Sequence, residues 1–195
     1  MPKKKSIKLS AQRFVEATDG VLDFFEKTSG LKDDYHTWCT DYAVIRLYRE
    51  FETLMLDALA GAINNDASTI STTVDVDFPK HLNEDVCRYL IVGTGYFDFR
   101  GRDGLIKIAK DYVPDSHYLV AILKDTKFKD TLERLSVFRN LAAHDSERAR
   151  NAAKAAIGGE KIGSAGSWLK KQGRLKKLCE TLKQLAQEIE KDAPY

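Results

Sequence analysis

The sequence predicts an all-α fold: a single-domain bundle of about six or seven helices. Apolar residues recur at spacings of three and four along most of the chain, as on the buried stripe of a helix. The longest such stretch, residues 34–64, has few helix breakers and spans about 45 Å at 1.5 Å per residue. One alternating stretch, residues 74–78, is too short to build a sheet. A chain of 195 residues fits one domain with a substantial core.

The starts and stops of the helices follow from caps, glycines and prolines. The first helix is expected from Ser10 and is stopped by Ser29-Gly30. Residues 65–79 are expected as a loop, and so are residues 93–101, whose aromatic side chains we expect to pack into the core. The remaining helices are expected over residues 34–64, 81–92, 103–113, 127–144, 147–157 and 167–191, and residues 117–123 are expected as a short apolar turn or helix. Gly173 is a weak point in the last of these helices.

Residues 1–9 are expected to form a basic disordered tip, and residues 10–195 a single HEPN-like helical domain in the sense given below. Lys3, Lys4 and Lys5 are not followed by an apolar region, which is unlike a secretory signal. No apolar run approaches the roughly 18 residues that a membrane span requires. We therefore expect a cytoplasmic protein with no membrane partner.

Metal, thiol and dinucleotide chemistry find little support in the sequence. No two histidines are four residues apart and none adjoins a cysteine, so neither a metal nor another cofactor is predicted. Three widely spaced cysteines, Cys39, Cys87 and Cys179, argue against a disulfide framework and are expected in the core, in a reducing compartment. The stretch Gly93-Thr94-Gly95 lacks the third glycine of a dinucleotide-binding loop.

Residues 131–144 carry the strongest candidate for function. The apolar positions of this expected helix are Leu132, Leu135, Val137, Phe138, Leu141 and Ala142. Among them, Arg139 offers planar donors to a phosphate, Asn140 an amide, and His144 a side chain that titrates near neutrality. Asn140 and His144 are one turn apart on the same side of a helix, whereas Arg139 and His144 are about 140° apart. Two copies related by a two-fold axis would bring both motifs to one shared cleft.

A basic block follows His144 directly. Residues 146–178 hold nine basic and two acidic residues, a net charge of +7, which leaves the rest of the chain at −5 because the total is +2. Such a block suits a polyanion such as RNA, although a solvated helix face has the same composition. The candidate RNA-binding residues are Arg148, Arg150, Lys170, Lys171, Arg174 and Lys177, the last four near one face of the last helix. Trp168 and Tyr96 are candidates for stacking on a base, with packing inside the protein as the alternative.

The segment Arg139-Asn140-Leu141-Ala142-Ala143-His144 resembles the motif of the HEPN superfamily, in which a histidine follows an arginine after four to six residues. The polar Asn140 directly after the arginine and the position near the end of a late helix are also similar. The resemblance covers residues 10–190 and is nearest to the RiboL-PSP-HEPN type. It implies a small helical bundle, usually dimeric, and in many members a metal-independent endoribonuclease of toxin–antitoxin or antiviral systems.

By this resemblance Arg139 holds the scissile phosphate, His144 is the acid and base, and Asn140 orients the site. RNA supplies the 2′-hydroxyl nucleophile, so cleavage leaves a cyclic phosphate and a 5′-hydroxyl end. The implied partners are RNA, a second copy of the chain in a homodimer, and an antitoxin or other regulatory protein. Some HEPN toxins carry a tyrosine two residues after the histidine, which their partner modifies. Ser146 stands at this position here, so that form of control is not expected.

Other interpretations of the same residues stay open. A non-catalytic HEPN-type module would bind RNA or a partner protein without cutting. In a purely structural interpretation, Arg139 forms surface ion pairs and His144 is a helix C-terminal residue favoured by the helix dipole. Asp145 either acts on His144 electrostatically or caps the following helix. A helical adaptor of an unrelated class is the third alternative.

Overall fold

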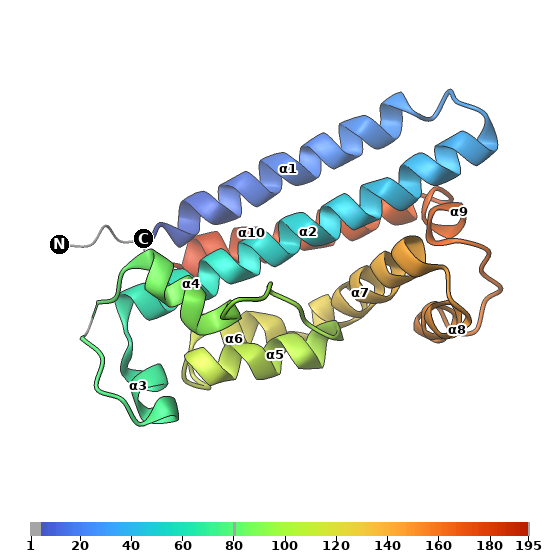
Figure 1. Ribbon diagram of the computed structural model, residues 1–195. Coiled ribbons are helices and arrows are strands. Elements are labelled where there is room, and N and C mark those ends of the chain that lie inside the picture. Colours follow the sequence, from blue (N-terminus) through green and yellow to red (C-terminus); the bar gives the residue numbers. More distant parts are fainter. Residues whose placement is uncertain (1–4, 80, 195) are drawn as a thin grey trace.

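The protein is all-α, as predicted. The computed structural model describes residues 5–79 and 81–194, and these form ten α-helices, one 3₁₀ turn and no strand (Figure 1). The elements are α1 (Ile7–Lys27), α2 (Asp33–Asn65), α3 (Ser68–Val74), α4 (Glu84–Val92), α5 (Gly101–Tyr112), α6 (Tyr118–Lys124), the 3₁₀ turn (Thr126–Phe128), α7 (Lys129–His144), α8 (Glu147–Ala156), α9 (Ala165–Leu169) and α10 (Arg174–Asp192).

The number of helices exceeds the predicted six or seven for three reasons. The stretch expected as a short turn or helix over residues 117–123 forms the helix α6. The expected loop over residues 65–79 contains α3, whose Ile70 is buried in a small apolar cluster. The expected last helix is two helices, α9 and α10, because Gln172 and Gly173 both adopt a positive φ, +56° and +66°. A right-handed helix does not continue through left-handed residues, so the chain turns at the glycine that the sequence marks as weak.

α2 is the spine of the bundle, and its 33 residues match the longest predicted helix. It packs against α1, α4, α7 and α9, and with fewer contacts against α5. In Figure 1, α1 runs along α2, α7 lies on the other side of α2, and α3 to α6 lie toward one end, while α10 packs against α1. The fully buried side chains of α2 include Leu47, Phe51, Leu54, Met55 and Leu59. Each contributes about 1.5–3 kcal/mol by leaving water. None of the described helices combines the length and apolar character needed to cross a membrane.

The first helix starts earlier than predicted. Ser6 accepts a hydrogen bond from the Leu9 N–H and so caps α1, and Ile7 is only 1% exposed. Lys5 forms ion pairs with Asp57 at 3.3 Å and with Glu84. Residues 5–9 therefore belong to the helical domain, which corrects this part of the expected disordered tip. Residues 1–4 lie outside the described residues.

The apolar stripe predicted for residues 127–144 is confirmed in α7. Leu132, Leu135, Phe138 and Leu141 are buried and recur every three residues, which turns this face toward the core. The helix ends at His144 because Asp145 takes a left-handed conformation, with φ of 37°. The next helix is capped by another residue: Ser146 accepts a hydrogen bond from the Ala149 N–H at 3.2 Å. Asp145 instead pairs with Arg150, so it does not cap α8.

The cysteines are buried in two of three cases. Cys87 and Cys179 lie in the core, where burial raises the pKa of the Cys87 thiol to about 11 and that of Cys179 to about 12. Cys39 is only half-buried, which corrects its expected core position. Phe97 and Phe99, in the loop before α5, pack into the core as predicted, whereas Tyr96 of the same loop is 81% exposed and does not.

The short helix α9 is held against α2 by backbone contact. The Gly166 N–H donates to the Asp41 carboxylate at 2.6 Å. A Cβ at Gly166 would overlap the carbonyl oxygen of Thr37 and lie 2.9 Å from the Asp41 nitrogen, so only glycine fits. Because both obstacles are backbone atoms of the spine, they cannot give way.

We predict that Gly166→Ala lowers the free energy of unfolding by about 1–3 kcal/mol, the usual cost of overpacking. Chemical denaturation followed by circular dichroism measures it. Gly104→Ala is the matched control, since its Cβ would meet Arg100 Cβ at an ordinary 3.5 Å inside α5. That change is expected to be neutral or stabilising by up to about 1 kcal/mol. Equal effects of the two substitutions would contradict the close contact of α9 with α2.

Candidate functional site

Four of the predicted site residues line one cleft of about 680 Å³. Arg139, Asn140 and His144 reach it from α7, and Arg148 reaches it from α8. The opposite wall is the segment that leads into α5 and carries Asp98 and Arg100. The sequence-predicted arginine, asparagine and histidine therefore meet within a single chain.

The side chain of Arg139 is held in place by α2 and by its neighbour Asn140. Its guanidinium lies 4.7 Å from the centre of the Tyr48 ring, which belongs to the spine helix. One of its nitrogens donates to the Asn140 Oδ1 at 2.8 Å. The aromatic face and the amide both fix the guanidinium, so Asn140 orients Arg139 directly. Arg139 and His144 line the same cleft of one chain, and a site shared between two copies stays a prediction.

Tyr48 is itself held by the loop before α5. Its ring stacks on Phe99 with centres 5.1 Å apart, and its hydroxyl donates to the Phe99 carbonyl oxygen at 3.2 Å. Burial raises the pKa of the Tyr48 hydroxyl above its ordinary value. The tyrosine therefore stays neutral and serves as a platform for the arginine.

A carboxylate that sequence reasoning did not select lies behind Arg139. Glu52 follows Tyr48 by one turn of α2, on the same side of the helix. Burial raises the pKa of Glu52 to about 7; Arg139 opposes this rise, and Asp98 adds to it. Near neutral pH Glu52 is therefore present in both charge states beside the guanidinium. The sequence shows Glu52 only as a polar interruption of an apolar helix, and its partner lies on another helix.

The side chain of His144 is the exposed part of the site. His144 is the last residue of α7, it is exposed, and it makes no hydrogen bond or ion pair within residues 5–79 and 81–194. Its ring nitrogens are therefore available to a bound molecule. A free imidazole and a fixed guanidinium that line one cleft are a combination that can bind a phosphodiester and move a proton.

The basic block does not form a single surface. Arg148 is exposed in the cleft, but Arg150 donates to the Gly163 carbonyl oxygen at 2.6 Å and pairs with Asp145. Lys170 is an internal clamp: its side chain is 7% exposed and pairs with Asp33 at 2.6 Å. Arg150 and Lys170 thus have partners within the chain, and their assignment as RNA-binding residues stays a prediction. Lys171 is exposed outside the cleft.

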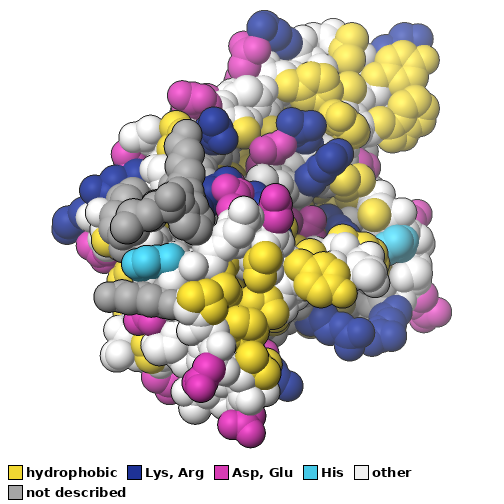
Figure 2. Space-filling view, turned by 60° about the vertical axis from the view of Figure 1, so that its left-hand side comes forward, with side chains coloured by type: hydrophobic (Ala, Val, Ile, Leu, Met, Phe, Trp, Pro, Cys, Tyr) yellow, Lys and Arg dark blue, Asp and Glu magenta, His cyan; other side chains and the backbone are white. Residues whose placement is uncertain are grey.

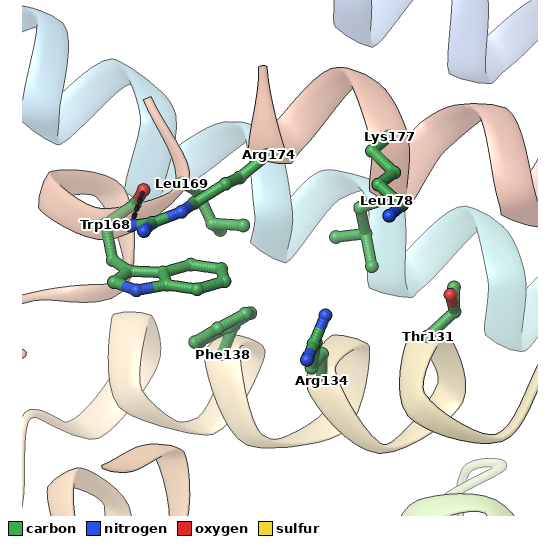
Figure 3. Close-up of a pocket in the computed structure, with 8 residues that line it drawn as sticks. All are labelled: Thr131, Arg134, Phe138, Trp168, Leu169, Arg174, Lys177 and Leu178. Carbon is green, nitrogen blue, oxygen red and sulfur yellow. Dashed lines mark hydrogen bonds between the residues drawn. The ribbon is translucent and has the colours of Figure 1, made fainter. Parts of the chain in front are cut away.

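Arg174 and Lys177 border a separate small hollow of about 60 Å³, together with Arg134 (Figure 3). The Arg174 guanidinium lies 4.0 Å from the centre of the Trp168 ring, and Phe138 packs on the same indole at 4.9 Å. Because these contacts occupy the indole, Trp168 does not offer the stacking surface considered from the sequence. The break at Gly173 also separates Lys170 from the helix that carries Arg174, so the predicted common face does not exist.

Tyr96 lies near the cleft and remains available. It precedes the cleft residue Asp98 by two positions and is 81% exposed. Within the described ranges, no three histidine, cysteine or acidic side chains come together as a set that could hold a metal ion. Comparison of the chain with family models, curated proteins and solved structures returned no match.

The raised pKa of Glu52 predicts a pH dependence of stability. Because the folded-state pKa of about 7 exceeds the ordinary 4.5, the proton is bound more tightly in the folded protein. This contribution is complete below pH 4.5 and is lost as the pH rises through 7. We predict that Glu52→Gln removes a decline of roughly 1–2 kcal/mol over this window, allowing for solvent screening.

Urea denaturation of the wild type and the variant across this pH range measures the difference. Glu50→Gln on the same helix is the control, because Glu50 pairs with Arg46 at 2.6 Å and not with the cleft arginine. The control should keep the pH dependence of the wild type. An unchanged pH dependence in Glu52→Gln would show that this carboxyl is not held in the raised-pKa environment.

Proposed function

We propose that this protein is a metal-independent endoribonuclease of HEPN type. The observation that carries the proposal is that Arg139, Asn140 and His144 line one open cleft. A fixed, planar guanidinium binds the scissile phosphodiester of RNA and offsets the charge that develops on it. Asn140 keeps the guanidinium in place through its 2.8 Å hydrogen bond.

In the proposed reaction the ribose 2′-oxygen attacks the adjacent phosphorus and the bond from phosphorus to the 5′-oxygen breaks. His144 accepts the proton of the 2′-hydroxyl and, in the protonated form, can donate one to the leaving 5′-oxygen. The products are a 2′,3′-cyclic phosphate and a 5′-hydroxyl end. The step needs no metal and no nucleophile from the protein, because the substrate supplies its own.

The charges around the cleft support a phosphate ligand. Arg100, Arg139 and Arg148 line it against the carboxylates of Asp98 and Glu133. Glu52, whose pKa lies at about 7, is neutral in part of the molecules at neutral pH and then leaves the charge of Arg139 free for the ligand. Tyr96, exposed beside the cleft, is suited to stack on a flanking base.

The wider biological role in this proposal comes from the resemblance. In this proposal the protein is a toxin or defence effector in the cytoplasm. It forms a homodimer, and an antitoxin or other regulatory protein is its partner. A single chain brings Arg139 and His144 to one cleft. The proposal therefore requires dimerisation less strictly than the helical geometry alone suggested.

We predict that Arg139→Ala and His144→Ala each lower RNA cleavage by 10²-fold or more, the usual range for a phosphate clamp or a proton-transfer group. Cleavage of a labelled RNA in EDTA measures the rate, and circular dichroism checks that the fold is intact. Arg13→Ala, an exposed arginine of α1 outside the cleft, is the matched control and should cut at the wild-type rate. Undiminished cleavage by both cleft variants would overturn the assignment. Binding of RNA by the wild type without any cleavage would favour the non-catalytic alternative.

A second comparison separates RNA contact from structural support within the basic block. Arg148→Ala should weaken RNA binding and flatten its salt dependence by about one phosphate contact, while the melting temperature stays unchanged. Arg150→Ala should instead lower the melting temperature, because it removes the contacts to Gly163 and Asp145. Filter binding at several salt concentrations and thermal melting measure the two effects. The opposite pattern would show that the nucleic acid binds elsewhere.

A further inference from the structure

The end of the bundle where α1 meets α2 exposes an unusual number of large apolar side chains. Figure 2 shows hydrophobic side chains gathered at the upper right, where this end of the molecule lies. The set, which we call the tip patch, is Phe24, Leu31, Tyr35, Trp38 and Tyr42, each more than a third exposed. The rings form two touching pairs: Tyr35 and Trp38 have centres 5.3 Å apart, and Phe24 and Tyr42 have centres 6.0 Å apart. Contiguous exposed rings of this kind mark a site of protein contact.

A groove of about 350 Å³ opens beside these rings, between α1 and α2. Small residues, Ala17, Gly20 and Ala43, line it together with Phe24 and Tyr42. A Cβ added at Gly20 would have no atom within 4 Å, so the space above this glycine is open. A cavity of about 150 Å³ already holds a benzene ring. The groove is therefore large enough for the indole of a tryptophan.

A protruding side chain stands next to the groove. Trp38 is 64% exposed and precedes Tyr42, a groove residue, by one turn on the same face of α2. The other tryptophan, Trp168, is covered by Arg174 and Phe138. A knob and a hole on one patch are what a two-fold symmetric interface requires, because each copy offers both.

The order of charges along α2 fits the same symmetry. Asp34, Trp38, Tyr42 and Arg46 form one row of exposed residues with a spacing of four. A two-fold axis between Trp38 and Tyr42 places each Trp38 against the partner's Tyr42, beside the partner's groove. The same axis places each Asp34 opposite the partner's Arg46, which also pairs with Glu50 of its own helix at 2.6 Å, so opposite charges meet at both ends of the row. Packing of such rows with a spacing of four is the commonest arrangement of two helices, with axes crossing at about −50°.

The area of the patch suits a dimer of moderate affinity. A fully buried aromatic side chain removes 150–250 Å² from water, so each half-exposed ring offers on the order of 100 Å². The rings of Phe24, Tyr35, Trp38 and Tyr42 thus supply about half of the roughly 800 Å² that each partner buries in a standard interface. Leu31 and the polar rim with Asp34 and Arg46 add to it.

We propose that the tip patch is a self-association surface, in which Trp38 of each copy enters the groove over Gly20 of a second copy of this chain. None of the tip-patch residues lines the Arg139 cleft, so the inference does not depend on the proposed ribonuclease activity.

Sedimentation velocity of the full chain at concentrations up to about 50 µM tests the proposal. The wild type should form dimers, and Trp38→Ala should raise the dissociation constant at least roughly tenfold, as expected for a central tryptophan. Gly20→Leu should do the same by filling the groove. Its melting temperature should be unchanged or higher, because it replaces a helix-interior glycine where space is open. Tyr89→Ala, which removes a ring 62% exposed on α4, should leave the dimer intact.

A charge exchange tests the orientation of the two copies. Asp34→Arg alone should weaken the dimer, since two arginines would then face each other. Asp34→Arg combined with Arg46→Asp should restore it. A wild type that stays monomeric at these concentrations would overturn the proposal. A dimer that Trp38→Ala and Gly20→Leu both leave unchanged would overturn it as well, by placing the interface on another face.

Discussion

The packing of α7 on α2 is the contact on which the candidate site depends. It brings the guanidinium of Arg139 over the ring of Tyr48, at 4.7 Å from its centre. Without this platform, a side chain with as many rotamers as arginine would have no fixed place, and its charge would not be aimed at the cleft. The loop before α5 completes the support, since Phe99 stacks on Tyr48 and accepts its hydroxyl hydrogen bond. Three segments distant in sequence thus determine the position of one positive charge.

The same contact explains the electrostatic character of the cleft. Burial between the two helices raises the pKa of Glu52 to about 7, and Arg139 only partly offsets the rise. The carboxyl and the guanidinium therefore influence each other electrostatically, and their summed charge changes around neutral pH. His144 lies at the exposed C-terminal end of α7, the helix that also carries Arg139. The arrangement separates a held cation from a free proton-transfer group, which are the two functions that phosphodiester cleavage through the 2′-hydroxyl requires.

The main helices could be predicted from the sequence because their apolar spacing is regular. The spine, the stripe of α7 and the burial of Phe97 and Phe99 follow from such local patterns. The break of the last helix depends on the left-handed conformations of Gln172 and Gly173, and the spacing of the leucines did not show it. Arg139, Asn140 and His144 were found from their chemistry. Glu52 and Tyr48 were not, because their role exists only when α2 and α7 meet. Spacing likewise gave no sign that Lys170 is buried against Asp33.

The central claim is that the Arg139 cleft directs a 2′-hydroxyl against its neighbouring phosphate. Mass spectrometry of the ends produced from an RNA, and from the same sequence made as DNA, tests it most directly, with EDTA present throughout. The predicted result is that only the RNA is cut and that each cut leaves a 2′,3′-cyclic phosphate and a 5′-hydroxyl. Cleavage of the DNA at a similar rate, or RNA products with a 3′-hydroxyl, would contradict the claim.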